Sequence, residues 1–325
     1  MRVFSVLRSL LGAVSAAALP HFIRGDPTGA TCGTTIPDGF GEMSRGLATM
    51  ELAGDFTVND FANVTVNVYF HVVAAVEESL DPAAGYISVA RIQKAFRYIN
   101  DRFRPHGFEF VVREIDYTYG VEFSDHTDPN FDFEVLGLHT RNGDLLDLNI
   151  WTATKLEGAA GGTKYCIFPL EGMTLGAGEG CVLKYDDFPP FNRGEATVHE
   201  LGHWLGLGHT FQEGVNGAAP SCDDPDGDWV ADTPIHLIHP ADKDDEFFNC
   251  LPINTCPNKE VNVHIFACVG SELTMRVQGS DPISNPMNYI WPKCQSGFTQ
   301  GQGVRMHNTW ENVRKVANRN LRQTR

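Results

Sequence analysis

The chain has 325 residues, of which 42% are hydrophobic, enough for a sizeable core in one large domain or two subdomains. Its formal net charge is −16 and its pI is about 5.1. Such an acidic surface repels phosphate backbones, so we expect no nucleic-acid partner.

The start of the chain has the order of a secretory signal peptide. Arg2 and Arg8 are basic, an apolar run follows, and small residues close it, which predicts cleavage after Ala16 or Ala18. The run is too short to span a bilayer, and no later stretch reaches the required length. We therefore expect a signal peptide over 1–18 and a secreted, extracellular protein that does not bind membranes.

Residues 19–57 are rich in Gly, Pro, Thr and Ala and show little periodicity, so we interpret them as a leader or pro-segment that precedes one domain over 58–325. From Val64 onward, apolar and polar residues alternate, which predicts a half-buried strand with His71 on its more polar face. The sequon NVT at Asn63 predicts N-glycosylation.

The first half of this domain reads as mixed α/β. Apolar residues at spacings of three and four predict an amphipathic helix over 89–103. Further strands are expected near 108–112, 146–150 and 181–185, and the glycine-rich stretch 158–180 is interpreted as a loop.

The second half is dense in Asp, Pro, Gly and Cys, with a closing helix expected over 301–320. We therefore expect an upper subdomain up to about residue 209, an irregular lower subdomain over 210–325, and a cleft between them. An even number of cysteines in an exported chain favours disulfides. The eight cysteines are Cys32, Cys166, Cys181, Cys222, Cys250, Cys256, Cys268 and Cys294.

The stretch TVHELGHWLGLGHTF holds three histidines and one glutamate. On a helix, His199 and His203 lie one turn apart on one face and can present two imidazoles to one ion. His209 can reach that ion only if the chain leaves the helix sharply, and Gly206 and Gly208 stand where the break is needed.

Three neutral imidazoles and one open position are the ligand set of a catalytic zinc site. Glu200 would face the open position, where it takes a proton from a zinc-activated water as general base and passes it to the leaving amine as general acid. The alternatives are a structural zinc site or scattered surface histidines. Structural sites usually fill all four positions and favour cysteine, which is missing from this stretch.

The motif HELGHWLGLGH matches the metzincin consensus H-E-x-x-H-x-x-G-x-x-H, and SNPMNYI resembles the methionine turn of these proteases, with Met287 in the turn. Together with Thr210 after the third histidine, the stretches GDWVADTP, NPMNY and FTQGQGVRM make the chain resemble the pappalysin (cytophagalysin-like) family, in its secreted fungal and bacterial members. The resemblance spans about 64–310.

The resemblance implies an α+β metzincin fold. The upper subdomain would hold a twisted, mixed five-stranded sheet with two helices, and the lower one would be irregular and disulfide-bonded, with the methionine turn and a C-terminal helix. It implies a zinc endopeptidase for proteins or peptides, whose edge strand, expected around 181–185, pairs with the substrate. Tyr289 would hydrogen-bond the oxyanion or the zinc, and Met287 would support the site by packing. Asn288 departs from the aspartate usual in the family.

The resemblance also implies disulfides in the lower subdomain, Cys222–Cys256 and Cys250–Cys294. Cys166 and Cys181 flank the glycine-rich loop and could form a third. Relatives bind calcium near SCDDPDGDWVADTP, and dense carboxylates suit that ion, although a solvated acidic loop is the alternative. The carboxylates are those of Asp223, Asp224, Asp226, Asp228 and Asp232.

Cys32 precedes Gly33 in the leader, as in a cysteine–glycine pair of the family's pro-segments. A thiolate is a good fourth zinc ligand, so Cys32 would displace the catalytic water and keep a zymogen silent until the leader is cut. The mature enzyme would then begin between Gly41 and Asn63. A Cys32–Cys268 disulfide is the equally open alternative.

Two other functions compete with a protease. One is a catalytically inactive binding module that keeps the metzincin fold, and the other is an amidase that uses the same zinc. The intact glutamate and three histidines argue against the first, and the extended motif with its methionine turn disfavours the second.

Overall fold

The structure of the chain is a computed structural model. It describes residues 32, 34, 36–54, 56–76, 84–127, 131–156, 164–211, 221–222, 227–238, 250–257, 263–266, 272–275, 280–289 and 294–323. The signal peptide expected over 1–18 lies outside these residues, and so does Cys268.

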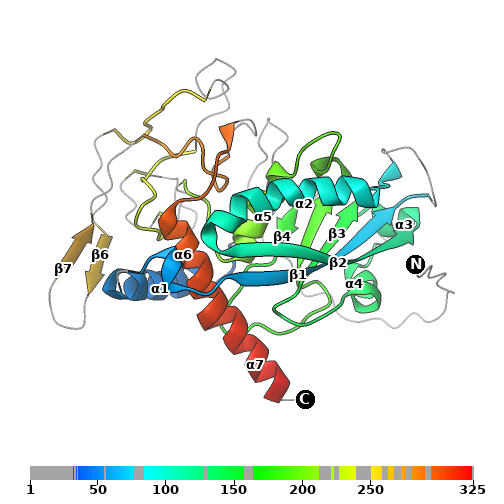
Figure 1. Cartoon of the computed structure of the whole chain (residues 1–325), viewed down its shortest axis with the longest axis horizontal. Helices are drawn as coiled ribbons and strands as arrows, with labels where there is room; N and C mark the ends of the chain where they lie inside the picture. Colours follow the sequence, from blue (N-terminus) through cyan, green and yellow to red (C-terminus); the bar gives the residue numbers. More distant parts are fainter. Residues whose placement is uncertain are drawn as a thin grey trace.

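Five strands form one mixed sheet in the order β2-β1-β3-β5-β4 (Figure 1). β1 (Val64–Ala74) pairs in parallel with β2 (Phe108–Tyr119) and β3 (Leu148–Ala153), and β3 pairs in parallel with β5 (Cys181–Lys184). β4 (Tyr165–Cys166) lies at the edge and is antiparallel to β5. The prediction that β5 is the edge strand is therefore wrong. β4 lies in the stretch 158–180, which the sequence analysis interprets as a loop. The strand is missed there because two residues carry no periodicity.

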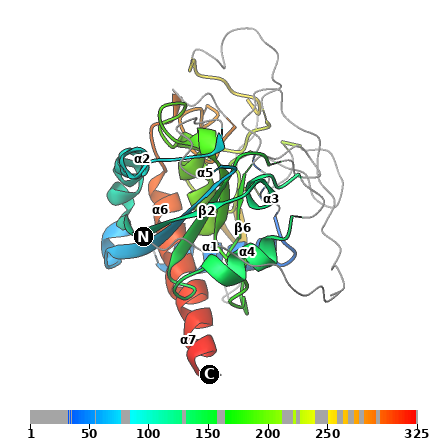
Figure 2. The ribbon, with the colours of Figure 1, turned by 90° about the vertical axis from the view of Figure 1, so that its right-hand side faces the viewer.

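The main hydrophobic core lies between one face of the sheet and two helices. The alternate apolar residues of β1 face this core. Helices α2 (Val89–Phe103) and α5 (Glu195–Trp204) cover it (Figures 1 and 2). α2 buries Ile92, Phe96 and Ile99, which recur about one turn apart. The strand and the amphipathic helix predicted here are confirmed.

The opposite face of the sheet is also covered, by the short helix α4 (Phe133–Thr140). His71, expected on a polar face, is fully buried there. Its ring stacks 5.0 Å from Trp151, and its Nδ1 and Nε2 lie 2.6 Å from Asp116 and 3.1 Å from Asn149. The alternation placed His71 on the correct face, but side chains of β2 and β3 surround it there, and the periodicity of one strand cannot reveal them.

Helix α1 (Phe40–Gly54) lies within the segment interpreted as a leader without regular structure. Leu47 packs with Phe168 in a small hydrophobic cluster, and Glu51 forms a two-point ion pair with the buried Arg305, at 2.8 and 2.9 Å. The three glycines among its fifteen residues weaken its helical pattern in the sequence.

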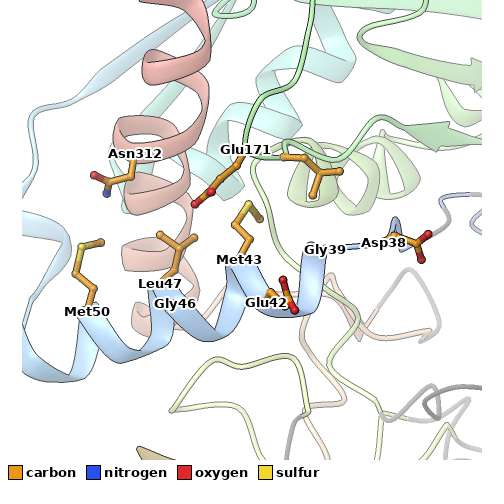
Figure 3. Close-up of a pocket in the computed structure, with 10 residues that line it drawn as sticks. Asp38, Gly39, Glu42, Met43, Gly46, Leu47, Met50, Glu171 and Asn312 are labelled. Atoms are coloured by element: carbon orange, nitrogen blue, oxygen red, sulfur yellow. The ribbon is translucent and has the colours of Figure 1, made fainter. Parts of the chain in front are cut away.

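The C-terminal helix packs against α1 and crosses it (Figure 1). It consists of α6 (Gln300–Thr309), a π-helical turn (Trp310–Arg314) and α7 (Lys315–Gln323), which confirms the expected closing helix. A pocket lies between α1, Glu171 and Asn312, and Figure 3 shows the acidic and methionine side chains that line it.

The described residues between 212 and 299 are largely irregular, as expected. Their two-stranded antiparallel sheet comprises β6 (Val263–Phe266) and β7 (Glu272–Met275). Among the described residues there are three disulfides. Cys222–Cys256 and Cys250–Cys294 are the two that the resemblance implies, and Cys166–Cys181 is the suggested third. Short elements complete the described chain: α3 (Val121–Ser124) and the 3₁₀ turns Val58–Asp60, Arg104–His106 and Tyr185–Asp187. Among the described residues, no helix combines the length and apolar character needed to cross a bilayer.

Candidate active site

Helix α5 carries the first two histidines and ends where the motif requires. The chain turns back after the helix, with Gly206 at φ +88° and the Leu207 amide donating to the Gly202 carbonyl at 2.9 Å. A side chain at Gly206 would also collide with Thr309 of α6. The predicted helix break is therefore present, and glycine is needed for its backbone conformation and for packing.

The break brings His209 back to the other two histidines. The three Nε2 atoms lie 3.0 Å (His199–His203), 3.1 Å (His199–His209) and 3.2 Å (His203–His209) apart. His199 Nδ1 lies 2.7 Å from the Pro286 carbonyl, and His203 Nδ1 lies 2.8 Å from the Leu207 carbonyl. Because these Nδ1 atoms donate to carbonyls, the Nε2 lone pairs of His199 and His203 point toward one another.

This convergence fits a metal ion. Burial lowers the pKa of His199 and His203 well below the usual histidine value, so both rings are neutral and could bind a metal ion. In a tetrahedral zinc site with Zn–N bonds of about 2.0–2.1 Å, two ligand nitrogens are roughly 3.3 Å apart, close to the separations found. The carbonyl partners fix the ring orientations, as outer hydrogen bonds do around metal ligands.

Glu200 lies beside the histidines and is completely buried. Burial raises the pKa of its carboxyl group to about 7. Its Oε1 has no hydrogen-bond partner among the described residues, and its Oε2 accepts from the Thr34 hydroxyl at 2.7 Å. A carboxylate of raised pKa at this point can take up and release a proton near neutral pH.

Cys32 of the leader reaches this same site. Its Sγ and one ring nitrogen of each of the three histidines lie within 4.8 Å of one another. In the described part of the chain, these four residues form the cluster that could bind a metal ion. Sγ also lies 3.5 Å from Glu200 Oε2. Burial and the Glu200 charge raise the pKa of the thiol well above its usual value. Cys32 is not in a disulfide, which contradicts the Cys32–Cys268 alternative.

Thr34 links the leader to the edge strand, a contact that sequence reasoning missed. Its hydroxyl donates to Glu200 and accepts from the backbone amide of Cys166 in β4, at 3.0 Å. Its own amide donates to Cys32 Sγ at 3.3 Å. Thr34 thus contacts Glu200 and the edge strand at once. Only its place beside Cys32 in the sequence could have indicated this.

A buried ion pair lies close to the same edge strand. Lys164 precedes β4, and its Nζ lies 2.9 Å from Asp187, with both side chains less than a tenth exposed. The Lys164 charge lowers the pKa of Glu200, against the larger effect of burial. Nothing in the sequence around Lys164 predicted this position.

The methionine turn lies under the histidines, as the resemblance implies. Met287 is fully buried against Gly202 of α5, where an added side chain would overlap its sulfur. The Tyr289 ring centroid lies 5.8 Å from that of His199 and 4.8 Å from that of His209. Met287 therefore packs beneath the helix, and Tyr289 stands beside the ligand rings.

The residues expected to bind calcium are only partly described. Asp223, Asp224 and Asp226 lie outside the described residues. Asp232 accepts from Thr299 and Gly301 at the start of α6. Asp228 is buried and accepts from Val230 and Thr233 through Oδ1, whereas no described residue is a hydrogen-bond partner of its Oδ2. The Asn63 side chain of the sequon is exposed just before β1.

Comparison with solved structures shows the fold. Mature mirolysin of Tannerella forsythia in complex with a cleaved peptide has a TM-score of 0.54 at 22% identity, over 79% of this chain and 96% of that one. A promirolysin mutant of the same organism has a TM-score of 0.58 at 19% identity, over 90% of this chain and 98% of that one. The predicted α+β metzincin fold is confirmed.

Sequence comparison covers nearly the whole chain. The family model Peptidase_M43, described as Pregnancy-associated plasma protein-A, matches residues 180–311. Extracellular metalloprotease 1 of Coccidioides posadasii is 33% identical over 97% of this chain and 99% of its own. An extracellular metalloprotease of Neurospora crassa is 30% identical over 88% of this chain and 90% of its own. Because sequence and fold agree, the chain belongs to the Peptidase_M43 (pappalysin) family and is a metalloendopeptidase.

Proposed function

We propose that this metalloendopeptidase uses zinc held by His199, His203 and His209, with Glu200 as general base and acid. The observation that carries the proposal is the convergence of three Nε2 atoms within 3.0–3.2 Å beside a fully buried carboxylate. A bound zinc ion would lower the pKa of a water to about 7 and polarise the substrate carbonyl.

The protein's own residues then divide the work. Glu200 takes the proton of the attacking water and passes it to the amine nitrogen that leaves. The Tyr289 hydroxyl donates to the oxyanion that forms on the substrate. The edge strand β4 binds the extended protein or peptide substrate, for which the Cys166 amide offers a hydrogen-bond donor.

A single assay separates this proposal from the two competing functions. Processed enzyme is incubated with casein and with a small amide substrate, each with and without a zinc chelator. We expect casein cleavage that the chelator abolishes and added zinc restores. Cleavage of the small amide alone would indicate an amidase, and binding without cleavage would indicate an inactive module.

We also propose that the protein is secreted as a zymogen and is N-glycosylated at Asn63. Relatives over most of the chain are named extracellular metalloproteases, which supports export. Latency would rest on two contacts from the leader. Cys32 would take the fourth zinc position, and Thr34 would occupy Glu200 and the Cys166 amide.

The contacts of α1 bear on where the zymogen is cut. The ring centroid of the buried Phe40 lies 4.4 Å from that of Phe168. The Phe168 centroid in turn lies 4.9 Å from that of His203, a proposed zinc ligand. α1 therefore supports the metal site through Phe168, whereas Cys32 and Thr34 occupy the positions where water and substrate would bind. We propose that α1 stays in the mature enzyme, so the cut falls before it rather than between Gly41 and Asn63.

This placement predicts the behaviour of two shortened chains. A chain that starts at Asp38 should fold with full zinc affinity, because it keeps α1. A chain that starts at Val58 should lose several kcal/mol of stability, since each buried apolar side chain of α1 contributes roughly 1.5–3 kcal/mol. Thermal unfolding and N-terminal sequencing of active enzyme test this, and a native start beyond residue 54 would contradict it.

Calcium is proposed as a second ion, with Asp228 as one ligand. Burial raises the pKa of Asp228 to about 7, and its unpartnered Oδ2 is an atom that a cation would satisfy. Calcium at 100 times its dissociation constant should stabilise the protein by about 2.7 kcal/mol relative to a calcium-selective chelator. Thermal unfolding measures this gain. Asp228→Asn should abolish it, and equal stability in calcium and chelator would rule the site out.

A further inference from the structure

The end of the active-site helix is held by a residue far along the chain. In a continuing helix, the Trp204 carbonyl would accept from the amide of Gly208, but the chain turns away after Trp204. The Trp204 carbonyl instead accepts from Nε of Arg314, at 3.0 Å. A cation at this position also complements the negative end of the helix dipole.

Arg314 holds the Trp204 side chain as well as its carbonyl. The guanidinium carbon lies 3.6 Å from the centre of the indole ring, and the indole Nε1 donates to Glu179 at 3.1 Å. Arg314 in turn donates to Glu179 and to the Leu145 carbonyl, both at 2.9 Å. Trp204 is thus held at three points by a pair of buried charges.

The C-terminal helix delivers Arg314 to this place. Arg314 is fully buried at the end of the π-helical turn, a wide turn that is rare and often lies near functional sites. One turn earlier, Thr309 lies against Gly206 in the helix break. The same helix therefore packs against the break and caps the helix end that precedes it.

The contacts of Arg314 with Trp204 fix the chain between two of the proposed zinc ligands, His203 and His209. His203 directly precedes Trp204, and its Nδ1 is oriented by the Leu207 carbonyl within the turn. His209 follows that turn. We propose that Arg314 is a positioning residue that fixes the end of α5, and through it the placement of His203 and His209 around the metal. This inference rests on the proposed function of the three histidines as zinc ligands.

The test measures zinc affinity in folded protein. The zinc dissociation constant of processed enzyme is determined by competition with a chromophoric chelator, at a temperature where every variant is fully folded by circular dichroism. Arg314→Met should weaken zinc binding by about 10- to 100-fold, as the loss of outer-shell partners usually does. Arg314→Lys should recover part of the affinity, because lysine can donate to Trp204 or to Glu179 but lacks the planar fork.

Asn318→Ala is the matched control. Asn318 is a buried polar residue of the same helix. Its side chain donates to Asp144 at 2.9 Å and accepts from the Leu145 amide at 3.3 Å, and both partners lie outside α5. It should lower thermal stability and leave zinc affinity unchanged. Unchanged zinc affinity in Arg314→Met, or equal losses in both variants, would overturn the positioning role. Failure of the unaltered enzyme to bind zinc would instead reject the proposed function.

Discussion

Replacing Glu200 with glutamine should lower kcat/KM for casein by at least about 10²–10⁴-fold, the usual contribution of a general acid–base group. Glutamine keeps the shape of the side chain but cannot accept the proton of the attacking water. The three histidine ligands remain, so bound zinc should stay near one ion per protein. Peptide hydrolysis and metal content are measured on the same preparation of processed enzyme.

Glu195→Gln is the matched control for this substitution. Glu195 is another buried carboxylate of α5, but it accepts from Arg193 at the start of the helix rather than facing the histidines. Its replacement should lower stability and leave kcat close to that of the unaltered enzyme. Ordinary activity in a folded, zinc-loaded Glu200→Gln protein would rule out the proposed mechanism.

Replacing Cys32 with alanine should make the uncut precursor active. Without the thiolate, water would regain the fourth zinc position. The remaining Thr34 contacts are two single hydrogen bonds, worth about 0.5–1.5 kcal/mol with the Cys166 amide and about 1.5–3 kcal/mol with the Glu200 carboxylate. Hydrolysis by precursor is measured at once after purification, with the intact N-terminus verified by mass spectrometry. Activity should rise from near zero toward the rate of processed enzyme.

Thr34→Val separates the two contacts of the leader. It removes the hydroxyl that bridges Glu200 and Cys166 but keeps the thiol, so this precursor should stay latent. A silent Cys32→Ala precursor that becomes active on cutting would show that the leader blocks the cleft by other means. Active enzyme that still carries Cys32 joined to Cys268 would end the latency proposal.

The sequence predicted the site better than its surroundings. His199 and His203 lie four residues apart on a helix, and Gly206 permits the break, so local geometry alone brings the three histidines together. Arg314 contacts Trp204 and Thr34 contacts Glu200, and each pair is separated by more than a hundred residues in the sequence. Hydrophobic periodicity within one element cannot predict such contacts. The burial of His71 was missed for the same reason, since the residues around it, Asp116, Asn149 and Trp151, lie on other strands.

The edge strand β4 consists of two residues, too few for stable pairing with β5 by hydrogen bonds alone. The Cys166–Cys181 disulfide joins the two strands covalently at this pair. The edge strand proposed to bind substrate is therefore held in place only after Cys166 and Cys181 have been oxidised to the disulfide. In a reducing compartment such as the cytosol, thiols replace this link and the edge is left weakly held. The redox state of the compartment thus decides whether the substrate-binding edge is stably formed. This requirement applies before any inhibition by the leader.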